Sequence, residues 1–123
     1  MIDEWIREIK AHTDPENLGI MLAHNGIVRG TAKDGKPVKG MKLSFDKVKL
    51  ESRINDMKKR DGIVEIKAWI NQGELKIGDD IMYILVAGRF RTDVLPVLQE
   101  FLTFVKGEVV REEEVMYEER RPF

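Results

Sequence analysis

Gln72-Gly-Glu-Leu-Lys-Ile-Gly-Asp-Asp-Ile-Met-Tyr-Ile-Leu-Val-Ala87 is the stretch of sequence that decides the fold. It ends in an unbroken apolar run, Ile81–Ala87, which is typical of a strand buried on both faces. The segment Val94–Lys106 then carries apolar side chains almost all round a helix, so we expect it to be the central, most buried helix. Residues 73–80 are predicted to form a loop. The stretch therefore predicts a buried strand followed by the helix that covers it.

A second apolar segment, Gly19–Arg29, predicts another strand, and Gly26 inside it indicates a bulge or a close backbone approach. Lys33-Asp-Gly-Lys36 is a strong turn signal, and the alternating segment 38–45 after it predicts a strand paired with its predecessor in a hairpin. The other predicted elements are a helix over 3–11, a helix capped by Asp46 and running to Arg60, a strand over 64–70, and a cap for the last helix at Thr92 or Asp93.

This order of elements predicts an α+β fold, a mostly antiparallel sheet with helices packed on it. A chain of 123 residues is long enough for one domain with a real core. We therefore predict a single domain over 1–123. Residues 108–123, which are acidic, are predicted to form an irregular tail.

Composition excludes several kinds of chemistry. The chain has no cysteine and two histidines, so thiolate catalysis, cysteine-based metal sites and histidine-rich metal centres are excluded. No cofactor or metal site is predicted. No phosphate-binding loop and no serine-hydrolase motif is present.

No apolar run approaches the ~20 residues that span a bilayer. The start of the chain is acidic and amphipathic, unlike a signal peptide, and we predict a cytoplasmic protein.

Charge is unevenly distributed along the chain. Residues 33–60 hold ten basic residues against four acidic ones, whereas 108–121 hold six glutamates against three arginines. These segments are either two solvated faces, or complementary surfaces that meet each other or different partners. Nucleic-acid binding is a weak alternative for the basic segment, because Phe45 is the one aromatic residue within it.

Three cationic positions are candidates for an anion site. Arg29 follows an apolar strand, and its planar guanidinium suits phosphate or carboxylate. Arg91 stands where the buried strand meets the last helix, a position at which helix amides add to anion binding. Lys106 ends that helix, where it either complements the helix dipole or acts as a nucleophile or base. Each position also has an ordinary structural interpretation as a solvent-exposed cation.

The order and spacing of these pieces resemble the MoaE family, the large subunit of molybdopterin synthase. Asn25-Gly-Ile-Val-Arg29 is similar to the family's Thr-Gly-x-Val-Arg, and Gly73-Glu-Leu-x-x-Gly-Asp79 precedes the valine-rich strand. The resemblance covers the chain from Ile6 to about Arg111. It implies an α/β hammerhead fold and a homodimer at the centre of a heterotetramer.

The resemblance also implies an activity and roles for particular residues. The family's enzymes convert cyclic pyranopterin monophosphate to molybdopterin, with sulfur delivered as a thiocarboxylate on the Gly-Gly tail of a small ubiquitin-like carrier. Arg29 and Arg91 would then bind the substrate phosphate or another anion. Lys106 would be the catalytic lysine that attacks or polarises the thiocarboxylate. The absence of cysteine fits such a scheme, since the carrier brings the sulfur.

Three positions depart from the family pattern. Phe90 stands where the family has a histidine before the arginine, Glu113 aligns with a second pocket lysine, and His24 replaces an aromatic residue. A carboxylate in place of a pocket cation would weaken binding of phosphate and thiocarboxylate. Two hypotheses therefore remain: a working synthase subunit, or a binding protein that keeps the carrier or pterin pocket without sulfur transfer.

Overall fold

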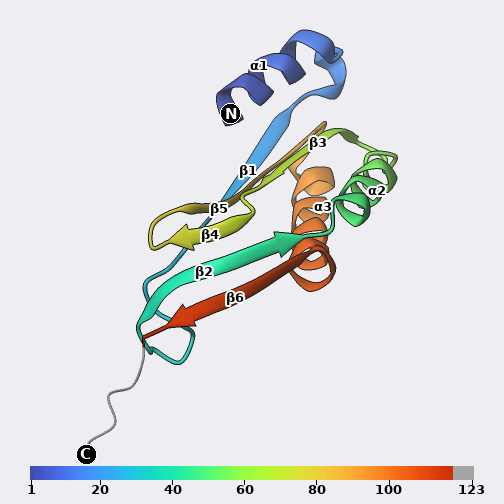
Figure 1. Ribbon diagram of the computed structural model, residues 1–123. Helices are drawn as coiled ribbons and strands as arrows, with labels where there is room; N and C mark the ends of the chain where they lie inside the picture. The colour runs from blue at the N-terminus through green and yellow to red at the C-terminus, as the bar shows by residue number, and fades with distance from the viewer. Residues whose placement is uncertain (118–123) are drawn as a thin grey trace, which may run out of the picture.

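Two three-stranded antiparallel sheets and three α-helices make up residues 1–117, the part of the chain that the computed structural model describes (Figure 1). This arrangement confirms the predicted α+β class. In chain order the elements are α1 (Ile2–His12), η1 (Pro15–Asn17), β1 (Ile20–Ile27), β2 (Val38–Phe45), α2 (Lys47–Met57), β3 (Ile63–Ile70), β4 (Gly73–Lys76), β5 (Asp80–Gly88), α3 (Arg91–Phe104), η2 (Val105–Val109) and β6 (Val110–Met116).

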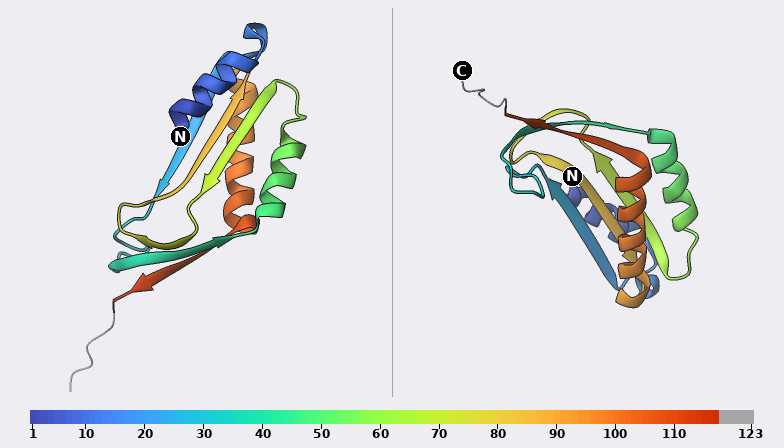
Figure 2. Two further views of the ribbon diagram at one scale, coloured as in Figure 1. Left: turned by 45° about the horizontal axis from the view of Figure 1, so that its top comes forward. Right: turned by 90° about the horizontal axis from the view of Figure 1, so that it is seen from below.

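The sheet with the longer strands, called the larger sheet from here on, has the strand order β1-β5-β3, with β5 at its centre. Residues 84–87 of β5 are fully buried, as the unbroken apolar run predicts. One face of this sheet packs on α3 through a core that includes Ile84, Val86 and Phe101. Part of the other face is covered by α1, through a smaller cluster around Ile9 and Leu85. The sheet thus lies between α3 and α1, with α2 beside α3 (Figure 2).

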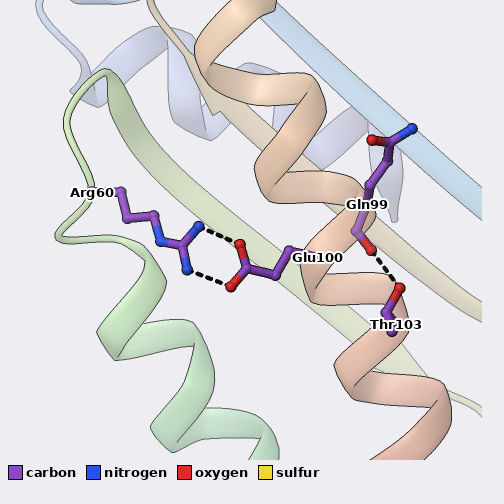
Figure 3. A network of polar contacts seen from close by, with 4 residues as sticks. All are labelled: Arg60, Gln99, Glu100 and Thr103. Atoms are coloured by element: carbon purple, nitrogen blue, oxygen red, sulfur yellow. Dashed lines mark hydrogen bonds and ion pairs between the residues drawn. The ribbon is translucent and has the colours of Figure 1, made fainter.

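Local signals at α2 agree with the structure. The Asp46 side chain accepts a hydrogen bond from the Lys49 amide at 3.1 Å, which caps the helix. The helix ends at Met57, three residues before the predicted end. Beyond it, the Arg60 guanidinium forms a two-point pair with the Glu100 carboxylate of α3, which ties the two helices together (Figure 3).

The predicted hairpin between β1 and β2 is wrong. β1 pairs with β5, while β2 is the centre of the smaller sheet, whose order is β4-β2-β6. A single bridge between Thr31 and Pro37 closes the turn, in which Gly35 has a φ of +87°, and the chain then leaves the larger sheet. β2 belongs to the smaller sheet because its two edges pair with β4 and β6.

Both segments predicted to be irregular contribute strands to the smaller sheet. Part of the predicted loop 73–80 is β4, because Leu75 is buried opposite Met41 of β2. Part of the predicted tail is β6, paired with β2 along its whole length. A run of three glutamates is tolerated there because one of them, Glu113, lies opposite Lys42. The rest of the predicted tail, 118–123, lies outside the described residues.

The last helix begins earlier than its sequence predicts. Phe90 is the N-cap, and its carbonyl accepts hydrogen bonds from the Asp93 and Val94 amides, both at 3.0 Å. Thr92 and Asp93 therefore lie inside the first turn and do not cap the helix. The regular helix ends at Phe104 and passes into a wider π-helical turn, η2. The predicted bulge at Gly26 is confirmed by a register shift between Gly26 and Ile27.

Candidate functional site

Lys106 projects from the π-helical turn that ends α3. Val105 and Val109, at the two ends of this turn, are buried, while Lys106, Gly107 and Glu108 between them are exposed. The buried valines anchor the turn, so that the residues between them point outward. π-helical turns are frequent at functional sites. Among the described residues Lys106 takes part in no ion pair, whereas its neighbour Glu108 lies 3.9 Å from Lys49.

The positive charge of Lys106 affects the pKa of His24 in β1. The pKa of His24 is lowered, first by burial and second by the positive charge of Lys106. Its Nε2 atom is buried and has no hydrogen-bond partner among the described residues. The ring therefore stays neutral around pH 7, since its ordinary pKa is already about 6.5. The fold thus places an imidazole that is uncharged around pH 7 within the electrostatic reach of the Lys106 ammonium group.

Replacement of His24 by phenylalanine is expected to make the protein less sensitive to acid. A histidine whose pKa is lowered in the folded state binds fewer protons there than in the unfolded state, so the free energy of unfolding falls as the pH drops below about 6.5. Urea unfolding at pH 7.5 and 5.5 measures this loss, which should be smaller in His24→Phe than in the wild type. His12→Asn, at an exposed position of α1, is the matched control. Equal pH dependence in the wild type and His24→Phe would refute the expectation.

Arg29 lies two residues beyond the end of β1, at the same end of the larger sheet as Asp80. Its side chain is exposed, and its Nε donates a hydrogen bond to the Thr31 carbonyl at 2.7 Å. This bond holds the guanidinium in the turn after β1 and leaves its terminal nitrogens for a ligand. α3 runs back from the Gly88 end of β5, so Lys106 also lies toward this end.

Arg91 and Lys106 lie at opposite ends of the segment formed by α3 and η2. Arg91 is the first residue of α3, and Lys106 is fifteen positions further on, which corresponds to about 22 Å along a helix. Beside Arg91, Phe90 is 59% exposed, and its ring lies under the Arg89 guanidinium at 5.3 Å. Within one chain, Arg91 and Phe90 are therefore not brought together with Lys106, Arg29 and His24.

Glu113 belongs to the smaller sheet. Lys42 of β2 lies between Glu113 of β6 and Glu74 of β4, so one cation faces a carboxylate on each side. Opposite charges at such cross-strand positions stabilise a sheet. Three other cations of the basic segment 33–60 also face carboxylates: Lys58 pairs with Glu65 at 2.9 Å, Arg60 pairs with Glu100, and Lys49 lies 3.9 Å from Glu108. The protein itself thus supplies acidic neighbours to four of the ten basic residues of this segment.

A polar cluster near Arg29 was not anticipated from the sequence. The Asp80 carboxylate accepts hydrogen bonds from the Tyr83 hydroxyl and from Asn25 Nδ2, the latter at 3.0 Å. These bonds, Tyr83 first, lower the pKa of Asp80. Asn71 Nδ2 donates to the Asp80 carbonyl at 2.9 Å. The cluster secures β1 to β5 next to the bulge at Gly26. Its signal in the sequence was the Asp79-Asp80 pair before the apolar run.

The fold and these side chains define a class: an α+β protein in which a lysine, an imidazole and an arginine lie toward one end of an antiparallel sheet. The chain belongs to the MoaE family, whose model, described as MoaE protein, matches residues 2–108. Membership of this family supports a role in molybdenum cofactor biosynthesis. An uncharacterized protein of Methanocaldococcus jannaschii is 32% identical over 109 residues, which are 85% of this chain and 87% of that protein.

Solved structures show the same fold at low sequence identity. A molybdopterin synthase structure from Staphylococcus aureus matches with a TM-score of 0.76 and 18% identity, covering 93% of this chain and 85% of that chain. A complex of subunits 1 and 2 of molybdopterin-converting factor from Helicobacter pylori matches with a TM-score of 0.71 and 18% identity, covering 97% of this chain and 82% of that chain.

Proposed function

We propose that this protein is the large subunit of a molybdopterin synthase. In this role it takes sulfur from the thiocarboxylate of a small ubiquitin-like carrier ending in Gly-Gly, and converts cyclic pyranopterin monophosphate to molybdopterin. The observation that carries the proposal is the position of Lys106. It is exposed on the turn between the buried Val105 and Val109, has no ion-pair partner among the described residues, and lowers the pKa of His24 by its charge. A chain without cysteine cannot itself supply the sulfur.

The role proposed for each cation follows from its position in the fold. Lys106 acts on the thiocarboxylate as an exposed point charge with donors that can rotate toward it. Water adds to the carbonyl carbon before the carbon–sulfur bond breaks, and the negative charge that this addition places on the carbonyl oxygen is stabilised by such a cation. When the bond breaks, the sulfur stays on the pterin and the carrier leaves with a carboxylate. Arg29, held in the turn after β1, binds the substrate phosphate through its free terminal nitrogens. Arg91 supplies a second anion contact at the start of α3, where helix amides add to it.

The second candidate function is a binding protein that retains the fold and the carrier or pterin pocket without transferring sulfur. Phe90 favours it, because a largely exposed phenyl ring at the start of α3 cannot donate or accept the proton that a histidine would. Glu113 favours it as well, because its position opposite Lys42 offers no cation to a pocket.

The partners and the location belong to the same proposal. The partner is a small ubiquitin-like sulfur carrier, in line with the two-subunit complex solved for Helicobacter pylori. Two copies of the chain form a homodimer within a heterotetramer, in the cytoplasm. No helix within residues 1–117 has both the length and the apolar composition needed to cross a membrane.

The test is a reconstituted synthase assay. Purified protein is mixed with thiocarboxylated carrier from the same source and with cyclic pyranopterin monophosphate, and the dithiolene product is scored. We expect product, with binding of the carrier measured in parallel by calorimetry. Carrier binding without product would overturn the synthase proposal in favour of the binding protein. The absence of both would leave the fold as the shared property.

A further inference from the structure

The ring of His24 lies on the face of the larger sheet that α3 covers. Side chains alternate between the two faces of a strand, so His24 shares its face with Leu22 and Gly26. Leu22 packs against the core beneath α3. The residue opposite His24 on β5 is the fully buried Ile84. The ring is therefore held between the sheet and the elements that cover it.

α3 brings Lys106 level with the part of β1 that holds His24. The helix follows Gly88, which pairs with Ile20 at the start of β1, and it then runs back along the sheet in the general direction of β1 (Figure 2). Lys106 is reached after about 22 Å of helix. The strand from Ile20 to Ile27 spans about 23 Å. The end of the helical segment and the second half of β1 thus lie at the same level.

The two ring nitrogens of His24 have different surroundings. Nε2 is buried and has no hydrogen-bond partner among the described residues. It is enclosed by apolar groups, since a Cβ at Gly26 would lie 3.6 Å from Nε2, from Ile81 Cβ and from Met82 Cγ. Nδ1 is not enclosed in this way, because the ring as a whole is only partly buried. Nδ1 is therefore the nitrogen that is open to a ligand.

The groups around His24 leave it ready to accept a proton. A neutral imidazole has one donor and one acceptor nitrogen, so a hydrogen on the buried Nε2 leaves the lone pair on Nδ1. Lys106 is the charged group that acts on the ring from the turn after α3. The β5 residues on this face are apolar. The Asp80 carboxylate binds Asn25, whose side chain points to the other face because it follows His24 in the strand.

We propose that His24 is the general base for the water that releases the carrier in the synthase reaction. Nδ1 takes a proton from this water, while Lys106 stabilises the oxygen on which negative charge develops. The inference rests on the proposed function, because that function supplies the substrate. It gives a chemical role to a residue that stands where the family pattern has an aromatic side chain.

The step is balanced with water as the one co-reactant. Sulfur bonded to both the terminal carbonyl carbon of the carrier and the pterin forms a thioester. The water oxygen bonds to that carbon, one water proton moves to Nδ1 of His24, and the carbonyl electron pair moves to the oxygen near Lys106. When the carbonyl re-forms, the carbon–sulfur bond breaks and its electron pair leaves with the sulfur, as a thiolate on the pterin. The carrier leaves as a carboxylic acid that ionises, and the imidazolium returns its proton to the solvent.

Two substitutions of His24 test the role of a base. His24→Phe keeps a ring of similar size, and His24→Gln keeps a hydrogen-bonding group that does not take up a proton. Each should lower the single-turnover rate of dithiolene formation at pH 7.5 by about 100-fold or more, and should leave the dissociation constant of the carrier within twofold of the wild type. His12→Asn, at an exposed position of α1, is the matched control. A wild-type rate in either His24 variant would overturn the inference.

The pH profile separates a base from a residue that only supports the fold. The wild-type rate should be level from pH 7 to 8 and should fall below about pH 6.5, since a protonated ring cannot accept a second proton and the pKa of His24 is lowered from that value. The residual rate of His24→Phe should not show this fall. The same fall in both proteins would contradict a base at position 24.

A thioester assay decides the matter if the wild type forms no dithiolene. The probe is the carrier with its terminal Gly-Gly carboxyl joined to mercaptoethanesulfonate as a thioester. Hydrolysis by the wild type that His24→Phe and His24→Gln both lose would support the inference and refute the proposed function. Hydrolysis no faster than in buffer, or equally fast in the wild type and the two variants, would overturn the inference as well.

Discussion

Lys106→Ala should lower the rate of dithiolene formation by about 100-fold or more, the loss typical of removing one group that stabilises developing charge. The reason is positional: Lys106 is the exposed cation of the turn between Val105 and Val109, and it takes part in no ion pair within the described structure. The fold should be unaffected, since truncating an exposed side chain typically changes stability by less than about 0.5 kcal/mol. Single-turnover assays with saturating carrier measure this rate.

Two further variants distinguish charge from geometry at this position. Lys106→Arg keeps a cation but spreads it over a planar fork, so partial activity would indicate that charge suffices. Lys49→Ala removes a nearby exposed lysine that already faces Glu108 at 3.9 Å, and it should retain wild-type activity. An unchanged rate in Lys106→Ala, or an equal loss in Lys49→Ala, would remove Lys106 from the site and leave general surface charge as the explanation.

Much of the fold could be predicted because its signals are local. The apolar run Ile81–Ala87 is the buried central strand, Asp46 caps α2, and Gly26 marks a bulge. Each feature depends on a few neighbouring residues, whose backbone preferences and burial act at short range. The start of α3 was misplaced because a backbone carbonyl, that of Phe90, does what a side-chain cap was expected to do.

Strand pairing and the site depend on contacts that a single sequence does not display. The turn before Val38 predicts a hairpin, yet β2 pairs with β4 and β6, whose pattern of charges resembles solvated loop. Glu113 lies in a strand because Lys42 lies opposite it. Likewise, the electrostatic influence of Lys106 on the pKa of His24 joins residues far apart in the chain. In the sequence His24 was one departure from a family pattern, and only the fold shows that the charge of the lysine reaches it.

Gly88→Ala should destabilise the protein by about 3 kcal/mol, the upper part of the range for overpacking a tight site. Gly88 ends β5 and pairs with both Ile20 and Ile63. A Cβ at this position would lie 2.2 Å from the Gly62 carbonyl oxygen and 2.7 Å from Val94 Cγ2. That carbonyl accepts a hydrogen bond from the Arg89 amide at 2.8 Å, so it cannot move without weakening the bond that holds the chain just before α3. Urea unfolding followed by circular dichroism measures the loss.

Gly107→Ala is the matched control for this prediction, because a Cβ at Gly107 has no atom within 4 Å and the residue lies in the turn beside Lys106. It should change the free energy of unfolding by less than about 0.5 kcal/mol. If the Gly88→Ala and Gly107→Ala proteins had the same free energy of unfolding, the start of β3 and the first turn of α3 could move apart at little cost in stability. The close contact of Gly62, Gly88 and Val94 would then not be what holds the first turn of α3, and with it Arg91, against the end of the sheet.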